Sequence, residues 1–86
     1  MDINMIANRM LAILACTEAS LPAEQMSDMR ELVEAGEPGI ALENLCTQLC
    51  EYNVVVSASY RHEVAAIGRA MGLAESTWQK LAEGDL

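Results

Sequence analysis

Apolar residues recur at intervals of three and four along almost the whole of this 86-residue chain. This spacing predicts amphipathic α-helices, and the only short run that could instead be extended is 54–56, which reads VVV. Proline and glycine divide the pattern into five helices, which we expect at approximately 2–18, 23–35, 38–53, 57–72 and 74–82. A chain of this length supports one hydrophobic core. We therefore expect an all-α fold, a small orthogonal bundle of about five short helices that forms a single domain over residues 1–86.

Residues with special backbone or capping properties mark the ends of these helices. Gly36 and Gly72 suit positions just after a helix because glycine adopts positive φ without a Cβ clash. Pro22 and Pro38 fit first helical turns, and Ser57 is a favourable N-cap. The run 54–56 is expected to be a buried connector, and the tail 83–86 to be frayed. The residues that we expect to face the core are Ile3, Ile6, Ala7, Met10, Ile13, Leu14, Met26, Met29, Val33, Leu42, Leu45, Cys46, Leu49, Tyr60, Val64, Ile67, Met71, Trp78, Leu81 and Ala82.

The chain is strongly acidic, with 13 acidic and 5 basic residues and a net charge of −8. Because binding of nucleic acid depends largely on neutralisation of phosphates by Lys and Arg, we do not expect a nucleic-acid partner. The excess of negative charge is concentrated between residues 18 and 51, where Arg30 is the only basic residue. Any function that uses this charge is therefore expected to involve the middle of the chain.

Three acids of the second predicted helix, Glu24, Asp28 and Glu31, are spaced at i, i+4 and i+7 and share one face. Like charges at this spacing repel, so helix formation alone does not favour them. Two interpretations are open. The face can be a solvated surface that keeps the chain in solution, or a surface complementary to a basic partner, such as an enzyme whose cationic active site handles nucleic acid.

The sequence contains no constellation typical of a catalytic, metal or cofactor site. The odd number of cysteines disfavours a disulfide framework, so we expect free thiols and a cytoplasmic location, with Cys46 and Cys50 acting as small buried hydrophobes. The single histidine, His62, is expected to be solvated on the polar side of its helix. No apolar run approaches the ~20 residues of a membrane-spanning helix, and the segment before residues 10–16 lacks the basic start of a signal peptide. We expect no enzyme, no cofactor and no membrane partner.

Two stretches of the sequence point to a family. Residues 34–46 read EAGEPGIALENLC and residues 50–73 read CEYNVVVSASYRHEVAAIGRAMGL, with Trp78 following in a short last helix. Over approximately residues 20–81 the chain resembles the MafI family of bacterial immunity proteins, small helical partners of secreted nuclease toxins. The most specific part of the resemblance is a helix, the turn Gly-Glu-Pro-Gly at 36–39, and a second helix.

The resemblance implies a function in contact-dependent growth inhibition, as the protective half of a toxin and immunity pair. Such a protein binds the C-terminal nuclease domain of its cognate toxin in the cytoplasm and covers the active site, here expected to be that of an EndoU-like ribonuclease. The alternatives are a small helix-turn-helix transcriptional regulator, in which Arg61, Arg69 and Lys80 would face DNA, and a methionine-rich helical adaptor. The residues that we expect to bind the partner are Glu24, Asp28, Glu31, Glu34, Glu37, Glu43 and Glu51.

Overall fold

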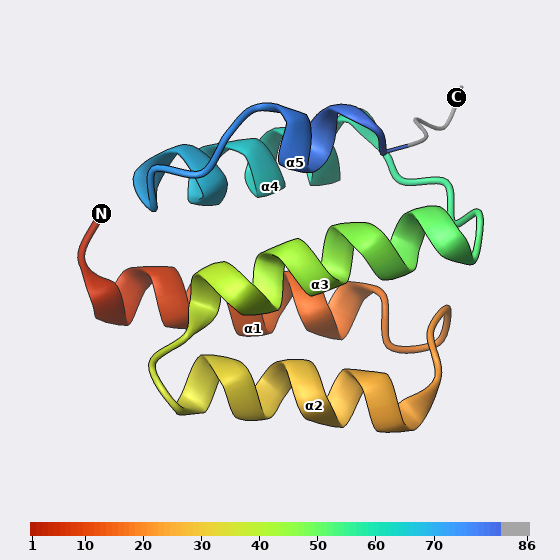
Figure 1. Cartoon of the computed structure of the whole chain (residues 1–86), viewed down its shortest axis with the longest axis horizontal. Helices are drawn as coiled ribbons and strands as arrows, with labels where there is room; N and C mark the ends of the chain where they lie inside the picture. The colour runs from red at the N-terminus through yellow and green to blue at the C-terminus, as the bar shows by residue number, and fades with distance from the viewer. Residues whose placement is uncertain (82–86) are drawn as a thin grey trace.

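The computed structural model describes residues 1–81 and contains five helices (Figure 1). They are α1 (Ile3–Cys16), α2 (Ala23–Glu34), α3 (Pro38–Glu51), α4 (Ala58–Ala70) and the single turn α5 (Ser76–Gln79). No strand occurs in this part of the chain, so the predicted all-α class with five helices is confirmed. Figure 1 shows α1, α2 and α3 running along nearly the same axis, in alternating directions, rather than crossing at right angles.

The helices divide into two edges and a centre. Helix α2 contacts α1 and α3 but, within residues 1–81, neither α4 nor α5. Helix α4 packs on α1 and α3 from the other side, and α5 covers α3 and α4. Helices α1 and α3 therefore form the centre, with α2 at one edge and the α4–α5 pair at the opposite edge (Figure 1).

Three helices end in the same way. The residue after each C-cap has positive φ, which is 83° at Gly36, 53° at Asn53 and 75° at Gly72. In each case the next N–H donates to a carbonyl five residues earlier, which is the hydrogen bond of a Schellman motif. These bonds run from Glu37 to Leu32, from Val54 to Leu49 and from Leu73 to Gly68. The predicted stops at Gly36 and Gly72 are confirmed, and Asn53 ends α3 because asparagine tolerates this conformation.

The predicted helix starts are confirmed with one adjustment. The Ser57 hydroxyl accepts a hydrogen bond from the Tyr60 N–H at 3.1 Å and caps α4. Pro38 is in the first turn of α3, where its missing N–H costs nothing. Pro22 is the N-cap residue of α2 instead of a member of its first turn, and its side chain makes no cap hydrogen bond.

The core matches most of the predicted apolar stripes. Residues from α1 to α5 that are buried include Met10, Leu14, Met26, Met29, Leu42, Leu45, Leu49, Val64, Ile67 and Trp78. Ile3 was expected inside, but it is 59% exposed because it is the first residue of α1, whose buried residues begin one turn later at Ile6. Tyr60 and Met71 are half-buried against the core.

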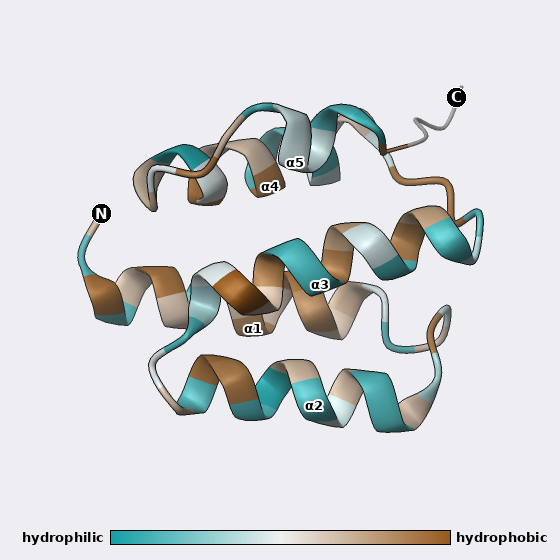
Figure 2. Cartoon of the chain, viewed as in Figure 1, coloured by the Kyte–Doolittle hydropathy of each residue, from teal (hydrophilic) through white to brown (hydrophobic). Residues whose placement is uncertain are grey.

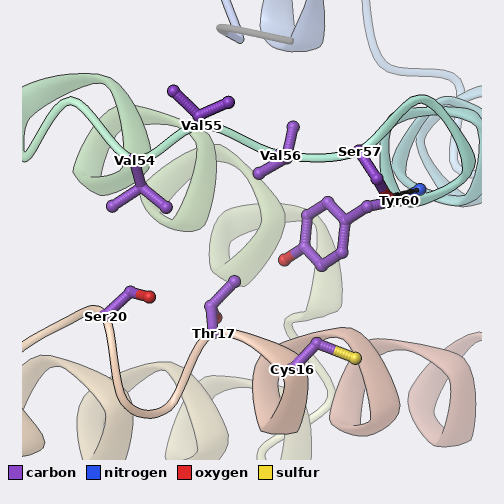
Figure 3. A pocket seen from close by; sticks show the side chains of 8 residues that line it. All are labelled: Cys16, Thr17, Ser20, Val54, Val55, Val56, Ser57 and Tyr60. Atoms are coloured by element: carbon purple, nitrogen blue, oxygen red, sulfur yellow. Dashed lines mark hydrogen bonds between the residues drawn. The ribbon is translucent and has the colours of Figure 1, made fainter. Parts of the chain in front are cut away.

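Two other expectations need correction. The connector 54–56 is only partly buried, with Val56 inside and Val55 59% exposed, because successive side chains of extended backbone point to opposite sides, as Figure 3 shows for Val54 and Val55. The last helix is only the four residues of α5, because Glu75 provides no side-chain cap hydrogen bond for a longer one. Ala82 and the tail 83–86 lie outside the described residues.

Candidate functional site: the acidic surface of α2 and α3

The core-facing side of α2 fixes the direction of its acidic residues. Met26, Met29 and Val33 are buried against the centre of the bundle. Because an α-helix has 3.6 residues per turn, Glu24, Asp28 and Glu31 fall on the opposite side, and all three are exposed. The hydropathy colouring of Figure 2 shows this alternation along α2, where hydrophilic segments separate apolar ones. We call Glu24, Asp28 and Glu31 the α2 stripe.

The other four predicted partner-binding residues are also exposed but are not part of this stripe. Glu34 is the last residue of α2, and Glu37 is the N-cap residue of α3, so both lie at the turn that joins these helices. Glu43 and Glu51 are on the outer side of α3. The structure therefore places five of the seven acids on α2 or its turn and two on the neighbouring helix.

The seven acids differ from the remaining acidic residues in having no side-chain partner within residues 1–81. Asp2 accepts a hydrogen bond from the Met5 N–H, and Glu18 forms an ion pair with Arg30. Glu63 pairs with Arg9 and Glu75 with Arg69. Every acid that the described fold uses for capping or pairing thus lies outside the predicted set, which is Glu24, Asp28, Glu31, Glu34, Glu37, Glu43 and Glu51.

The charged residues around α4 show the opposite arrangement. The Arg9 side chain donates to both carboxylate oxygens of Glu63, with Nε at 2.6 Å, and this hydrogen bonding lowers the pKa of Glu63. Arg69 likewise donates to Glu75 at 2.7 and 2.8 Å and lowers the pKa of that carboxyl group. These pairs connect α4 to α1 and to the segment before α5, so their charge is used within the fold.

The cysteines and the histidine agree with a non-catalytic interpretation of these residues. All three thiols are free, and burial raises the pKa of the Cys46 thiol to about 12, so it remains a protonated hydrophobe. Cys50 is only half-buried, and its thiol donates to the Lys80 carbonyl at 3.4 Å. His62 is exposed, as expected. Residues 1–81 contain no group of three His, Cys, Asp or Glu side chains that could hold a metal ion.

Two concave features were not predicted from the sequence. A pocket of about 280 Å³ lies between the end of α1 and the connector 54–56, with the Tyr60 ring on one wall (Figure 3). A narrower groove of about 180 Å³ lies between α2 and α3 and is lined by Gln25, Asp28, Met29, Asn44 and Gln48. Both join segments distant in the sequence, so periodicity alone could not indicate them. The i, i+4 pair Asn44 and Gln48, polar and beside a buried stripe, was the one available signal for the groove.

Comparison with known proteins adds no relative. No protein-family model matches the chain, and neither the curated proteins nor the solved structures contain a match. Among the helices of residues 1–81, none combines the length and apolar character needed to cross a membrane. The class that the fold itself defines is a small all-α bundle with a one-sided acidic surface.

Proposed function

We propose that this chain is an immunity protein of the MafI type. It binds the C-terminal nuclease domain of a cognate secreted toxin, an EndoU-like ribonuclease, in the bacterial cytoplasm, and it blocks the active site with its acidic surface. The observation that carries the proposal is the set of seven exposed acids that have no side-chain partner in the described fold. The resemblance of residues 34–46 and 50–73 to that family supports the same assignment.

The geometry suits a competitor for a substrate's phosphates. An enzyme that cleaves RNA presents cationic groups where the phosphates bind. The α2 stripe offers carboxylates on a rigid helix whose buried side is fixed by Met26, Met29 and Val33. Because the helix is already formed, little conformational entropy is lost on docking. Opposite fields on the two surfaces also accelerate their encounter.

The turn between α2 and α3 supports the family resemblance locally. Gly36 has φ +83°, Pro38 starts α3, and Glu37 between them is exposed. The Gly-Glu-Pro-Gly sequence thus makes an abrupt reversal that aligns α2 with α3 and adds its own acid to the end of the surface. We infer that this turn is retained because it sets how the two acidic helices are presented together.

The test is inhibition and binding with a purified EndoU-like nuclease domain encoded beside the gene for this chain. Wild type should bind and inhibit it, with an association rate that falls as NaCl is raised. The α2 double variant Glu24→Gln/Asp28→Asn should associate roughly tenfold more slowly at low salt. The control Glu43→Gln/Glu51→Gln removes the same charge from α3 and should have a smaller effect.

The outcomes separate the parts of the proposal. Absence of inhibition by wild type would contradict the immunity function. Inhibition with equal losses in the two double variants would show that only net charge acts and that the α2 stripe is not the contact.

The structure gives little support to the two alternatives. A recognition helix must enter a DNA groove, whereas α5 has four residues and its Trp78 is buried. A methionine-rich docking surface is also not favoured, because Met10, Met26 and Met29 are in the core. A gel shift with duplex DNA at moderate salt remains the direct test of the regulator.

A further inference from the structure

The groove between α2 and α3 differs from the other concave regions in the chemistry of its lining. Gln25, Asp28 and Met29 come from α2, and Asn44 and Gln48 face them from α3. Four of these five side chains carry oxygen acceptors, and no basic residue lines the groove. Its volume of about 180 Å³ is several times the ~30 Å³ that one water molecule takes in the liquid, so it can hold a small polar group.

Two of these acceptors are unsatisfied. The Oε1 atoms of Gln25 and Gln48 are both buried, and neither has a hydrogen-bond partner. Buried polar atoms are nearly always paired in native proteins, so two unpaired oxygens on the walls of one groove require an explanation. Asp28, the central residue of the α2 stripe, also lines this groove and has no partner within residues 1–81.

We infer that the groove receives the guanidinium group of one arginine side chain from the partner. The inference rests on the proposed function and names the partner chemistry at one point of its interface. Asp28 supplies the opposite charge, while Gln25 and Gln48 supply neutral oxygens on the two sides. Guanidinium is favoured over ammonium because it holds five N–H donors in a flat fork that can reach acceptors on both walls.

Access to the two oxygens requires only a local motion. The terminal torsion of a glutamine side chain is broad, so rotation about one bond turns the oxygen toward the groove. The backbone of α2 and α3 need not move, because both helices are held by buried residues on their other sides. The groove also adjoins the α2 stripe through Asp28, so an arginine bound there belongs to the same interface as the stripe.

The test uses the isolated chain and needs no nuclease. N-ethylguanidinium, which copies the end of an arginine side chain, is titrated into ¹⁵N-labelled protein, and the side-chain NH₂ signals of Gln25, Asn44 and Gln48 are followed. These signals should shift and saturate together. Binding should be at least about fivefold tighter than that of n-butylammonium, which copies lysine as a point charge.

Three variants locate the binding. Asp28→Asn should weaken N-ethylguanidinium binding by roughly fivefold or more. Glu31→Gln removes the same charge from the same helix but does not line the groove, so its affinity should remain within about twofold of wild type. Gln25→Leu/Gln48→Leu replaces the unpaired oxygens with apolar groups of similar size. It should be at least as resistant to urea as wild type and should lose binding.

Shifts that rise without saturation, or that affect Glu31 as much as the groove, would overturn the inference. Equal affinity for the two cations would overturn the choice of guanidinium. These results leave nuclease inhibition as a separate measurement. Failure of the groove with intact inhibition would reject only the arginine site, whereas failure of inhibition would reject the proposed function.

Discussion

Helices α2 and α4 lie at opposite edges of the same bundle and use their charged residues in opposite ways. On α4, Glu63 pairs with Arg9 of α1, and Arg69 pairs with Glu75 before α5. On α2, Arg30 pairs with Glu18, but the acids of the α2 stripe have no partner within residues 1–81. Both helices bury an apolar side of similar kind. The difference is therefore in what their outer charges do.

The comparison separates charges that serve folding from charges that folding does not explain. An ion pair between two elements favours one relative position of those elements, as at α1 and α4. Like charges on one helix face repel instead, and they reduce helix stability slightly. If this distinction is correct, substitutions near α4 should lower stability, and substitutions in the α2 stripe should affect binding.

The largest effect is expected at the contact between α4 and α5. Trp78 is 3% exposed, and its ring lies directly over Gly68, where an added Cβ would be 2.2 Å from the Cζ3 atom. Trp78→Ala should lower the free energy of unfolding by about 3–5 kcal/mol, because it empties this contact and leaves a cavity. Urea denaturation followed by circular dichroism measures the change.

Gly68→Ala gives a second measure of the same contact. The new methyl group would force the Trp78 ring to move, so this variant should also be destabilised, by about 1–3 kcal/mol. Trp78 is the only tryptophan, so its fluorescence reports the displacement. A Gly68→Ala protein with unchanged emission and stability would contradict the packing described here.

The next effect is expected at the Arg9–Glu63 pair and depends on pH. The hydrogen bonds from Arg9 lower the pKa of Glu63 in the folded chain below its ordinary value of 4.5. The pair therefore stabilises the fold above that pH, and the contribution is lost as pH falls through the lowered value. Glu63→Gln should lower Tm by a few degrees at most at pH 7.

A pH series of thermal melts tests this assignment. The difference in Tm between wild type and Glu63→Gln should disappear as the pH is lowered below 4. Glu75→Gln is the comparison, since Arg69 and Glu75 are more exposed than Arg9 and Glu63 and should contribute less. A difference that persists unchanged at low pH would show that Glu63 acts through packing instead of charge.

The sequence predicted the parts of this fold that depend on local pattern. The helix class, the stops at Gly36 and Gly72, the Ser57 cap and most buried stripes follow from periodicity and backbone preference, and they are confirmed. The positions of the seven acids on the surface follow from the same periodicity. Features that depend on distant neighbours were not predicted. The exposure of Ile3, the fit of Trp78 over Gly68 and the groove lined by Gln25 and Gln48 require knowledge of which helices meet.

Within α2, the two ends offer a sharper version of the comparison. Glu24 is in the first turn, where the partial positive charge of the helix N-terminus favours a carboxylate, and Glu34 is at the C-terminal end, where a carboxylate is unfavourable. Glu24→Gln should therefore lower stability and Glu34→Gln should raise it, each by about 0.3–1 kcal/mol at low salt. Urea denaturation at low and high NaCl measures both, and 1 M NaCl should reduce both differences. Equal changes of the same sign would indicate that only net charge is being measured.

The smallest effect on stability is expected in the middle of the α2 stripe, and it discriminates most clearly between the two edges. Asp28 and Glu31 are three residues apart, so their repulsion costs about 0.2–0.5 kcal/mol. Asp28→Asn/Glu31→Gln should recover that amount in urea denaturation, because the replacements have nearly the same shape and helix propensity. The same variant should bind the cognate nuclease domain more slowly, with a weaker dependence on salt. Glu63→Gln, on α4, should do the reverse by losing stability while binding at the wild-type rate. A loss of stability in the α2 variant, with no change in association, would mean that these acids serve the fold, and the contrast between the two edges would then fail.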